Sequence, residues 1–284
     1  MRREKDYSWM NCISTALLAY FFTIPLHELF HALTYLAYGD RVVCFSAGAV
    51  LSAQELDLSS LPVFHRIMVA GGSASILNAI IGVCLIFVVL KVRMGPTTRV
   101  FMIQLTGAHL TEGFGYFMIG GLFGLGDWHN VFLSLQDRPE LIAPLRTTLA
   151  VVGSAGVVGL FFLLNVFSYY FIEDKENKKE RLRVASRLHL LMLILGFSLG
   201  MLVTALSPAN ESGELSLGIG ALYNMMWIPF FWGFMFTGVM KTLPPKESRF
   251  LYKLPEKPNY ALWAAGLALI LIDVFVFGPG IWFQ

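Results

Sequence analysis

Two histidines and a glutamate stand close together near the N-terminus, in the run His27-Glu28-Leu29-Phe30-His31. On a helix, side chains four residues apart lie on one face, so His27 and His31 can present two imidazoles to a single ion. Zinc binds such nitrogens readily and prefers a tetrahedral site. Glu28 follows the first histidine directly, where its carboxylate can act as a base toward a water on the metal. This is the HExxH pattern, which is typical of zinc hydrolases.

The surroundings of this motif make it more informative than the pattern alone. It lies in a long apolar stretch, and two histidines and a glutamate are costly to place in an apolar helix. Ionisable groups inside a membrane are functional in most cases. The plainer alternative is a polar cluster that neighbouring helices satisfy by hydrogen bonds. We favour the metal site.

A catalytic zinc keeps three protein ligands and one water, so a third ligand must come from elsewhere in the chain. The candidates are Asp127, Glu112, His109 and His129. We favour Asp127, because the glycines before it in the segment 124–130 can end a helix and direct the carboxylate inward. Glu112 remains the alternative, with His109 one helical turn before it on the same face.

The elements that carry these residues are long apolar stretches. Hydrophobic residues make up 56% of the 284 residues and charged residues only 14%, which is far from the composition of a soluble domain. We therefore expect an all-α polytopic membrane protein. Seven stretches are long enough to span a bilayer, approximately 9–37, 63–90, 99–125, 145–172, 187–207, 217–240 and 260–282.

The distribution of basic residues predicts how these spans are oriented. Of the 21 Lys and Arg residues, 17 fall in the segments 1–8, 91–99, 173–187 and 241–259, and four fall in the alternate segments. The positive-inside rule then predicts a cytoplasmic N-terminus and a C-terminus on the outer or lumenal side. With this topology, the histidine motif, the polar start of the second span and Asp127 all lie toward the outer side.

A short β-rich segment, 41–51, follows the first span and predicts an extended segment or hairpin at the outer surface. We expect two regions in the chain. Residues 1–135 would form a three-span zinc metalloprotease core, and residues 136–284 a four-span accessory membrane region.

Several of these residues together resemble the site-2 protease family of intramembrane zinc metalloproteases. The first is the HExxH span near the N-terminus. The second is Ala70-Gly71-Gly72 followed by Asn78, which resembles the small-residue turn and asparagine of that family. The third is Asp127 at the end of the third span. The resemblance covers about the first 135 residues, and the last four spans match no motif of the family.

The chain departs from the family pattern in two places. The third motif of the family is an Asn/Pro stretch leading to Asp-Gly, whereas Asp127 here is followed by Trp128. Gly72 stands where proline is common. These departures indicate a divergent branch, and they bear most on the third metal ligand.

The resemblance implies a role for each matching residue. His27, His31 and Asp127 would hold Zn²⁺, Glu28 would be the general base, and Asn78 would hold the substrate backbone. The partner would be a transmembrane or membrane-proximal protein substrate in the lipid bilayer, without nucleic acid, and the 41–51 segment would pair with the unwound substrate as an added strand.

Two other functions remain open at this point. One is a different membrane zinc hydrolase, acting on a prenylated protein or a lipid amide, in which a glutamate such as Glu112 is the third ligand. The other is a transporter or receptor that binds metal without catalysis. In that case metal binding would be tight, and function would not depend on Glu28.

Overall fold

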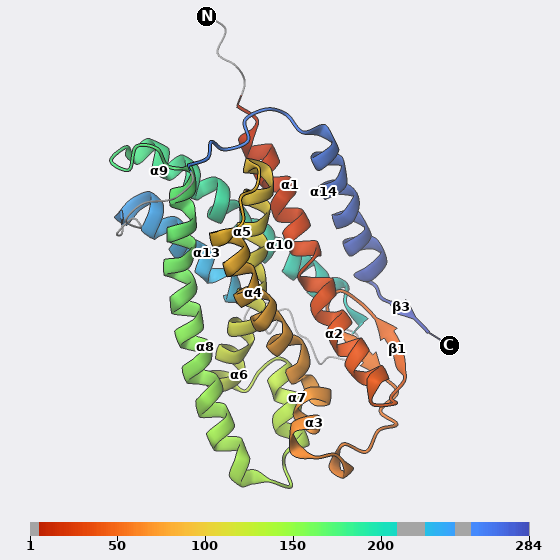
Figure 1. The fold of residues 1–284 in the computed structure, drawn as a ribbon. Coiled ribbons are helices and arrows are strands. Elements are labelled where there is room, and N and C mark those ends of the chain that lie inside the picture. The colour runs from red at the N-terminus through yellow and green to blue at the C-terminus, as the bar shows by residue number, and fades with distance from the viewer. Residues whose placement is uncertain (1–5, 209–224, 242–250, 284) are drawn as a thin grey trace, which may run out of the picture.

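The computed structural model describes residues 6–208, 225–241 and 251–283, and these are mostly helical (Figure 1). Within these ranges, five helices are long and apolar enough to cross a membrane, and they coincide with five of the seven predicted spans. They are Ser8–Ala37, Val63–Lys91, Pro139–Phe171, Lys178–Leu206 and Tyr260–Phe277.

All five of these spans are composite, and the bounds of their parts are as follows. The first joins α1 (Ser8–Phe21) to α2 (Ile24–Ala37), and the second joins α3 (Val63–Ile67), a π-helical turn (Met68–Gly72) and α4 (Ser73–Lys91). The third is α8 (Pro139–Ser168) with a 3-10 turn (Tyr169–Phe171), and the fourth joins α9 (Lys178–Ala185), a π-helical turn (Ser186–Leu190) and α10 (Leu191–Leu206). The last is α14 (Tyr260–Ile272) with a π-helical turn (Asp273–Phe277).

The predicted span 99–125 is helical but is not one of the five apolar spans. It comprises α5 (Pro96–Leu110), a π-helical turn (Thr111–Gly115) and α6 (Tyr116–Phe123). The polar side chains of Gln104, His109 and Glu112 lower its hydropathy. All three are buried, so they face other helices and not lipid.

The predicted span 217–240 is described only in part, because residues 209–224 lie outside the described residues. From there the chain forms a 3-10 turn (Met225–Trp227), α13 (Ile228–Phe234) and a π-helical turn (Met235–Met240). The helix Ile228–Met240 is apolar but short for a membrane span.

The β-rich segment forms the predicted hairpin, with strands β1 (Val42–Phe45) and β2 (Val50–Ser52) paired antiparallel. A third strand, β3 (Ile281–Trp282), pairs antiparallel with the other edge of β1, giving the order β2-β1-β3. The prediction that the last span extends to residue 282 is therefore wrong. Its helix ends at Phe277, because Gly278, Pro279 and Gly280 turn the chain toward the sheet.

The core combines side chains from both halves of the sequence. Helix α1 packs along α14, α5 and α10, and α6 packs along α8 (Figure 1). One buried apolar cluster includes Tyr20 of α1, Leu160 of α8, Trp227 and Phe230. Helix α1, which precedes the helix that carries the histidines, is thus held by spans from the far end of the chain.

Contacts join the basic segments at the end of the molecule where α1 begins. Arg187 forms an ion pair with Asp6 at 2.8 Å, and Arg183 pairs with Glu256. The backbone N–H of Tyr7 donates to the carbonyl of Glu256 at 3.0 Å. Four residues before Glu256 in the chain, the hydroxyl of Tyr252 accepts a hydrogen bond of 2.9 Å from the buried guanidinium of Arg99.

A short helix completes the elements that position the site. The chain between α6 and α8 forms α7 (Asp127–Ser134), which packs against the π-helical turn Met68–Gly72. A 3-10 turn (Leu58–Ser60) lies between the hairpin and α3.

Candidate metal centre

The first two predicted ligands come from one face of α2. His27 and His31 are 2% and 7% exposed, and Glu28 beside them is 8% exposed. Pro25 occupies the first turn of α2. Backbone N–H groups in a first turn have no partner within the helix, so the N–H that proline lacks costs no hydrogen bond there. The helix therefore starts just before the motif and brings both imidazoles to the same side.

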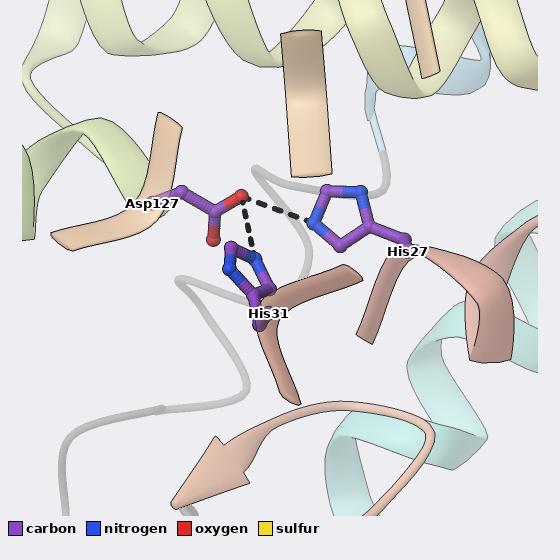
Figure 2. Close-up of side chains that lie close together, drawn as sticks. All are labelled: His27, His31 and Asp127. Carbon is purple, nitrogen blue, oxygen red and sulfur yellow. Dashed lines mark hydrogen bonds and ion pairs between the residues drawn. The ribbon is translucent and has the colours of Figure 1, made fainter. Parts of the chain in front are cut away.

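Asp127 meets these two histidines although it lies 100 residues from His27 along the chain. Its Oδ2 atom is 3.0 Å from Nε2 of His27 and 3.2 Å from Nε2 of His31. Figure 2 shows both rings directed at this single carboxylate oxygen. The side chain of Asp127 is 19% exposed, so the cluster is nearly enclosed.

Glycines break the helix before Asp127, as the sequence predicted. Helix α6 ends at Phe123, and Gly124 caps it with φ of +68°. Gly126 has φ of +67°, a backbone conformation that L-residues with a side chain adopt rarely. Helix α7 then begins at Asp127 in a new direction, which returns its carboxylate to α2.

The small-residue turn before α4 allows Asp127 to approach. Gly71 has φ of +152°, and a Cβ atom there would lie 2.4 Å from the carbonyl oxygen of Asp127 and 2.9 Å from its Cβ. No side chain fits in that space. The Gly71 position thus sets how deeply the start of α7 can sit against the second span.

The three side chains fit a zinc ion. Their ligand atoms all lie within 4.8 Å of one another, and they are the only such group of histidine, cysteine and acidic side chains in the described part of the chain. Two ligands that each lie about 2.0–2.1 Å from a tetrahedral ion are about 3.4 Å apart. The two nitrogen–oxygen distances to Asp127, 3.0 and 3.2 Å, are hydrogen-bond lengths, which brings the three side chains close enough to share one ion. Two imidazoles and a carboxylate are also a common donor set for catalytic zinc.

A second layer of polar groups contacts His27 on the side that faces away from Asp127. The Nδ2 atom of Asn78 lies 3.0 Å from Nδ1 of His27, and its Oδ1 atom lies 2.5 Å from Nδ1 of His109. Asn78 is fully buried and His109 is 2% exposed. The ring of Tyr116 stacks on the ring of His27 with centroids 4.8 Å apart. These contacts restrict the rotation of a ligand ring.

The other candidates for the third ligand lie elsewhere. Oε2 of Glu112 is 3.9 Å from Nδ1 of His27, the nitrogen that faces away from Asp127. His109 contacts Asn78, and the exposed ring of His129 contacts the carbonyl oxygen of Gly124 at 3.2 Å. Among the predicted alternatives, the structure groups only Asp127 with both histidines.

The cluster opens into a cavity of about 1020 Å³. Glu28 lines this cavity together with the two histidines and Asp127, as do Val50, Leu51 and Ser52 of strand β2. A cavity of this size holds far more than an ion and a water molecule. The cavity therefore has room for a large molecule next to Glu28.

Two parts of the site were not found from the sequence. The stacking of Tyr116 on His27 had no signal, because aromatic residues are common in membrane helices. The contact between Asn78 and His109 joins two different spans, and only the burial cost of each polar group pointed to it.

Comparisons of the chain with protein-family models, with curated proteins and with solved structures found no match.

Proposed function

We propose that this protein is an intramembrane zinc metalloprotease that hydrolyses peptide bonds of membrane-embedded or membrane-proximal proteins. The observation that carries the proposal is the meeting of His27, His31 and Asp127 at the wall of a large cavity that Glu28 also lines. The resemblance of the first 135 residues to the site-2 protease family agrees with this function.

In this proposal, Nε2 of His27, Nε2 of His31 and the carboxylate of Asp127 hold the ion. Zinc bound there supplies a Lewis acid and a water that is activated near neutral pH. Asn78 and Tyr116 keep the His27 ring in place. Both amide atoms of Asn78 already have side-chain contacts, so we assign it to positioning His27 instead of holding substrate backbone.

Glu28 acts as the general base and then as the general acid. Its carboxylate takes a proton from the water whose oxygen attacks the scissile carbonyl carbon. It then gives this proton to the amide nitrogen as the C–N bond breaks. The remaining proton of the water leaves the new carboxyl group for the amine, so that the products are a carboxylate and an ammonium group. Glu28 is not a ligand in this scheme, and its loss should leave metal binding intact.

A peptide must be extended to reach the site, because the carbonyl groups of a helix are held in hydrogen bonds four residues apart. Strand β2 lies at the cavity and is an edge of the sheet. Its outer edge pairs with no other described strand, so it can accept an unwound substrate as an additional strand.

The membrane orientation follows the basic residues. We place the N-terminus in the cytoplasm, and the C-terminus and the catalytic end toward the outer or lumenal side. The protein would then cut its substrates near the outer boundary of the bilayer.

The metal content of purified variants tests the ligand set. We expect about one zinc per chain in the wild type and in Glu112→Ala, and little zinc in His27→Ala, His31→Ala and Asp127→Ala. His129→Ala is a matched control, because His129 lies near the site and its exposed ring contacts only a carbonyl in the described structure. Zinc lost in Glu112→Ala and kept in Asp127→Ala would favour the other class of membrane zinc hydrolase.

The activity of Glu28→Gln tests the reaction. We expect this variant to bind zinc as the wild type does and to cleave no substrate. Glu55→Gln, at a carboxylate whose side chain is 60% exposed, is the control for loss of a charge. Full cleavage by Glu28→Gln at equal expression would refute the mechanism.

A further inference from the structure

The cavity follows one face of the first membrane helix. Tyr20, Ile24, His27, His31 and Tyr35 all line it, at spacings of three or four residues. Fifteen residues of helix rise about 22 Å. The histidines lie near the middle of this length, so the cavity extends well beyond the metal centre in both directions.

The end of the cavity beside α1 has an apolar floor, which we define as Tyr20, Ile24, Met226 and Trp227. Tyr20, Met226 and Trp227 belong to one buried apolar cluster, and Ile24 packs against it. The rings of Tyr20 and Trp227 are stacked with centroids 6.0 Å apart. None of the four side chains carries a charge.

The floor is rigidly backed by two further elements. A Cβ atom at Gly196 of α10 would lie 2.5 Å from the ring of Trp227, and one at Gly115 would lie 3.0 Å from Cβ of Met226. These side chains therefore have little room to move away. The floor is built partly from residues after position 190, to which no motif of the sequence assigns a role.

The opposite end of the cavity reaches the surface at a mouth that carries several polar side chains beside apolar ones such as Leu56 and Leu133. Its lining includes Asp40, Gln54, His129 and Asn130, of which the last three are exposed. The metal centre thus lies between an apolar floor and a polar mouth.

Strand β2 distinguishes a peptide from a lipid as the occupant. A lipid amide would also match an apolar floor and a polar mouth. It has no peptide backbone, however, and so cannot form the run of hydrogen bonds that an unpaired strand edge offers. In an extended peptide, successive side chains point to opposite faces. A peptide on the β2 edge therefore directs alternate side chains toward and away from the floor.

From this arrangement, we infer that the floor is a subsite for a bulky apolar side chain next to the scissile bond of a membrane-anchored peptide. The inference rests on the proposed function and adds the feature of the substrate that is recognised. Ile24 is the specificity-determining residue, because it is half-buried at the floor one helical turn from His27.

The test uses purified, zinc-loaded full-length protein and single-span peptide substrates. The residues flanking the mapped cleavage site are changed in turn to Ala, Leu, Phe and Asp, and initial cleavage rates are measured. We expect one flanking position at which Leu and Phe are cleaved about 10-fold faster, or more, than Ala and Asp. Equal rates for all four residues at every flanking position would overturn the inference.

Variants of Ile24 tie this preference to the floor. Ile24→Phe fills the subsite and should shift the preference from Phe to Ala, whereas Ile24→Ala should shift it toward Phe. Leu33→Phe is the matched control on the same helix, since Leu33 is 51% exposed and lies outside the cavity lining. Zinc content and melting temperature are measured for each variant, and Ile24→Ala serves if Ile24→Phe loses zinc.

The two possible failures give different results. Ile24 variants that keep zinc and cleave with the wild-type preference would overturn the subsite while leaving the protease intact. A zinc-loaded wild type that cleaves no peptide but releases fatty acid from a lipid amide would overturn the proposed function, and the subsite with it.

Discussion

The substitution Gly71→Ala should weaken zinc binding although it changes none of the proposed ligand residues. In the structure, a Cβ atom at residue 71 would lie 2.4 Å from the backbone oxygen of Asp127, whereas real contacts of this kind stay above about 3.0 Å. The start of α7 must then retreat from the second span by at least about 0.6 Å. Asp127 is the first residue of α7, so its carboxylate moves with the backbone.

The expected size of the effect follows from this displacement. The Asp127 carboxylate would then lie farther from the two imidazoles than the present 3.0 and 3.2 Å. Disturbing the groups that orient a metal ligand typically costs 10–100-fold in metal affinity. The φ of +152° at Gly71 adds a backbone strain of about 1–3 kcal/mol when a side chain is present.

The assay compares zinc affinity, by competition with a chelator, with the melting temperature of each variant. Gly39→Ala is the matched control, since Gly39 has φ of +83° and a Cβ atom added there would meet no atom within 4 Å. We expect both variants to lose stability and only Gly71→Ala to lose zinc affinity, by about 10–100-fold. A folded Gly71→Ala protein with wild-type zinc affinity would refute the role of this contact.

Three further predictions concern the surroundings of the ion. Asn78→Ala leaves Nδ1 of His27 without its amide contact, and we expect zinc affinity to fall about 10–100-fold while the stoichiometry at saturating zinc stays at the wild-type value. Isothermal titration measures this zinc affinity. An affinity equal to that of the wild type would contradict the positioning role of Asn78. Removal of zinc with a chelator should lower the melting temperature, because an ion at 100 times its Kd stabilises the folded state by about 2.7 kcal/mol. The Asp127→Ala variant should have the same melting curve with and without zinc, because it lacks one of the proposed ligands. Tyr116→Leu removes the ring that stacks on His27, and we expect a weaker zinc affinity with cleavage retained at saturating zinc, as measured by titrating the metal in the cleavage assay.

The sequence predicted most of the apolar helices, because lipid imposes a length and a composition that a single chain displays. It also predicted the helix break before Asp127, since Gly124 and Gly126 stand beside it and both have positive φ. The pairing of His27 with His31 needed only the helical repeat. These features are local, and local chemistry is readable from neighbouring residues.

The pairing of distant elements was not predictable in this way. The helix from Pro96 to Phe123 has polar side chains that neighbouring helices bury. Its hydropathy is therefore lower than that of a span that faces lipid. Strand β3 has two residues and is recognisable only by its partner β1. The turn at Gly278-Pro279-Gly280 was its one local signal, and the apolar residues beyond it were assigned to the helix.

Strand β3 also decides which edge of the small sheet lies beside the cavity. It covers the edge of β1 that β2 leaves free, so that β2 alone offers an unpaired edge next to the cavity among the described strands. An incoming strand then has a single place to add beside the metal centre, and two copies of the protein cannot join through the covered edge of β1. Because β3 is the last strand of the described chain, a fusion placed after it would begin beside the sheet (Figure 1). Affinity tags therefore belong at the N-terminal end of α1, which lies away from the sheet (Figure 1).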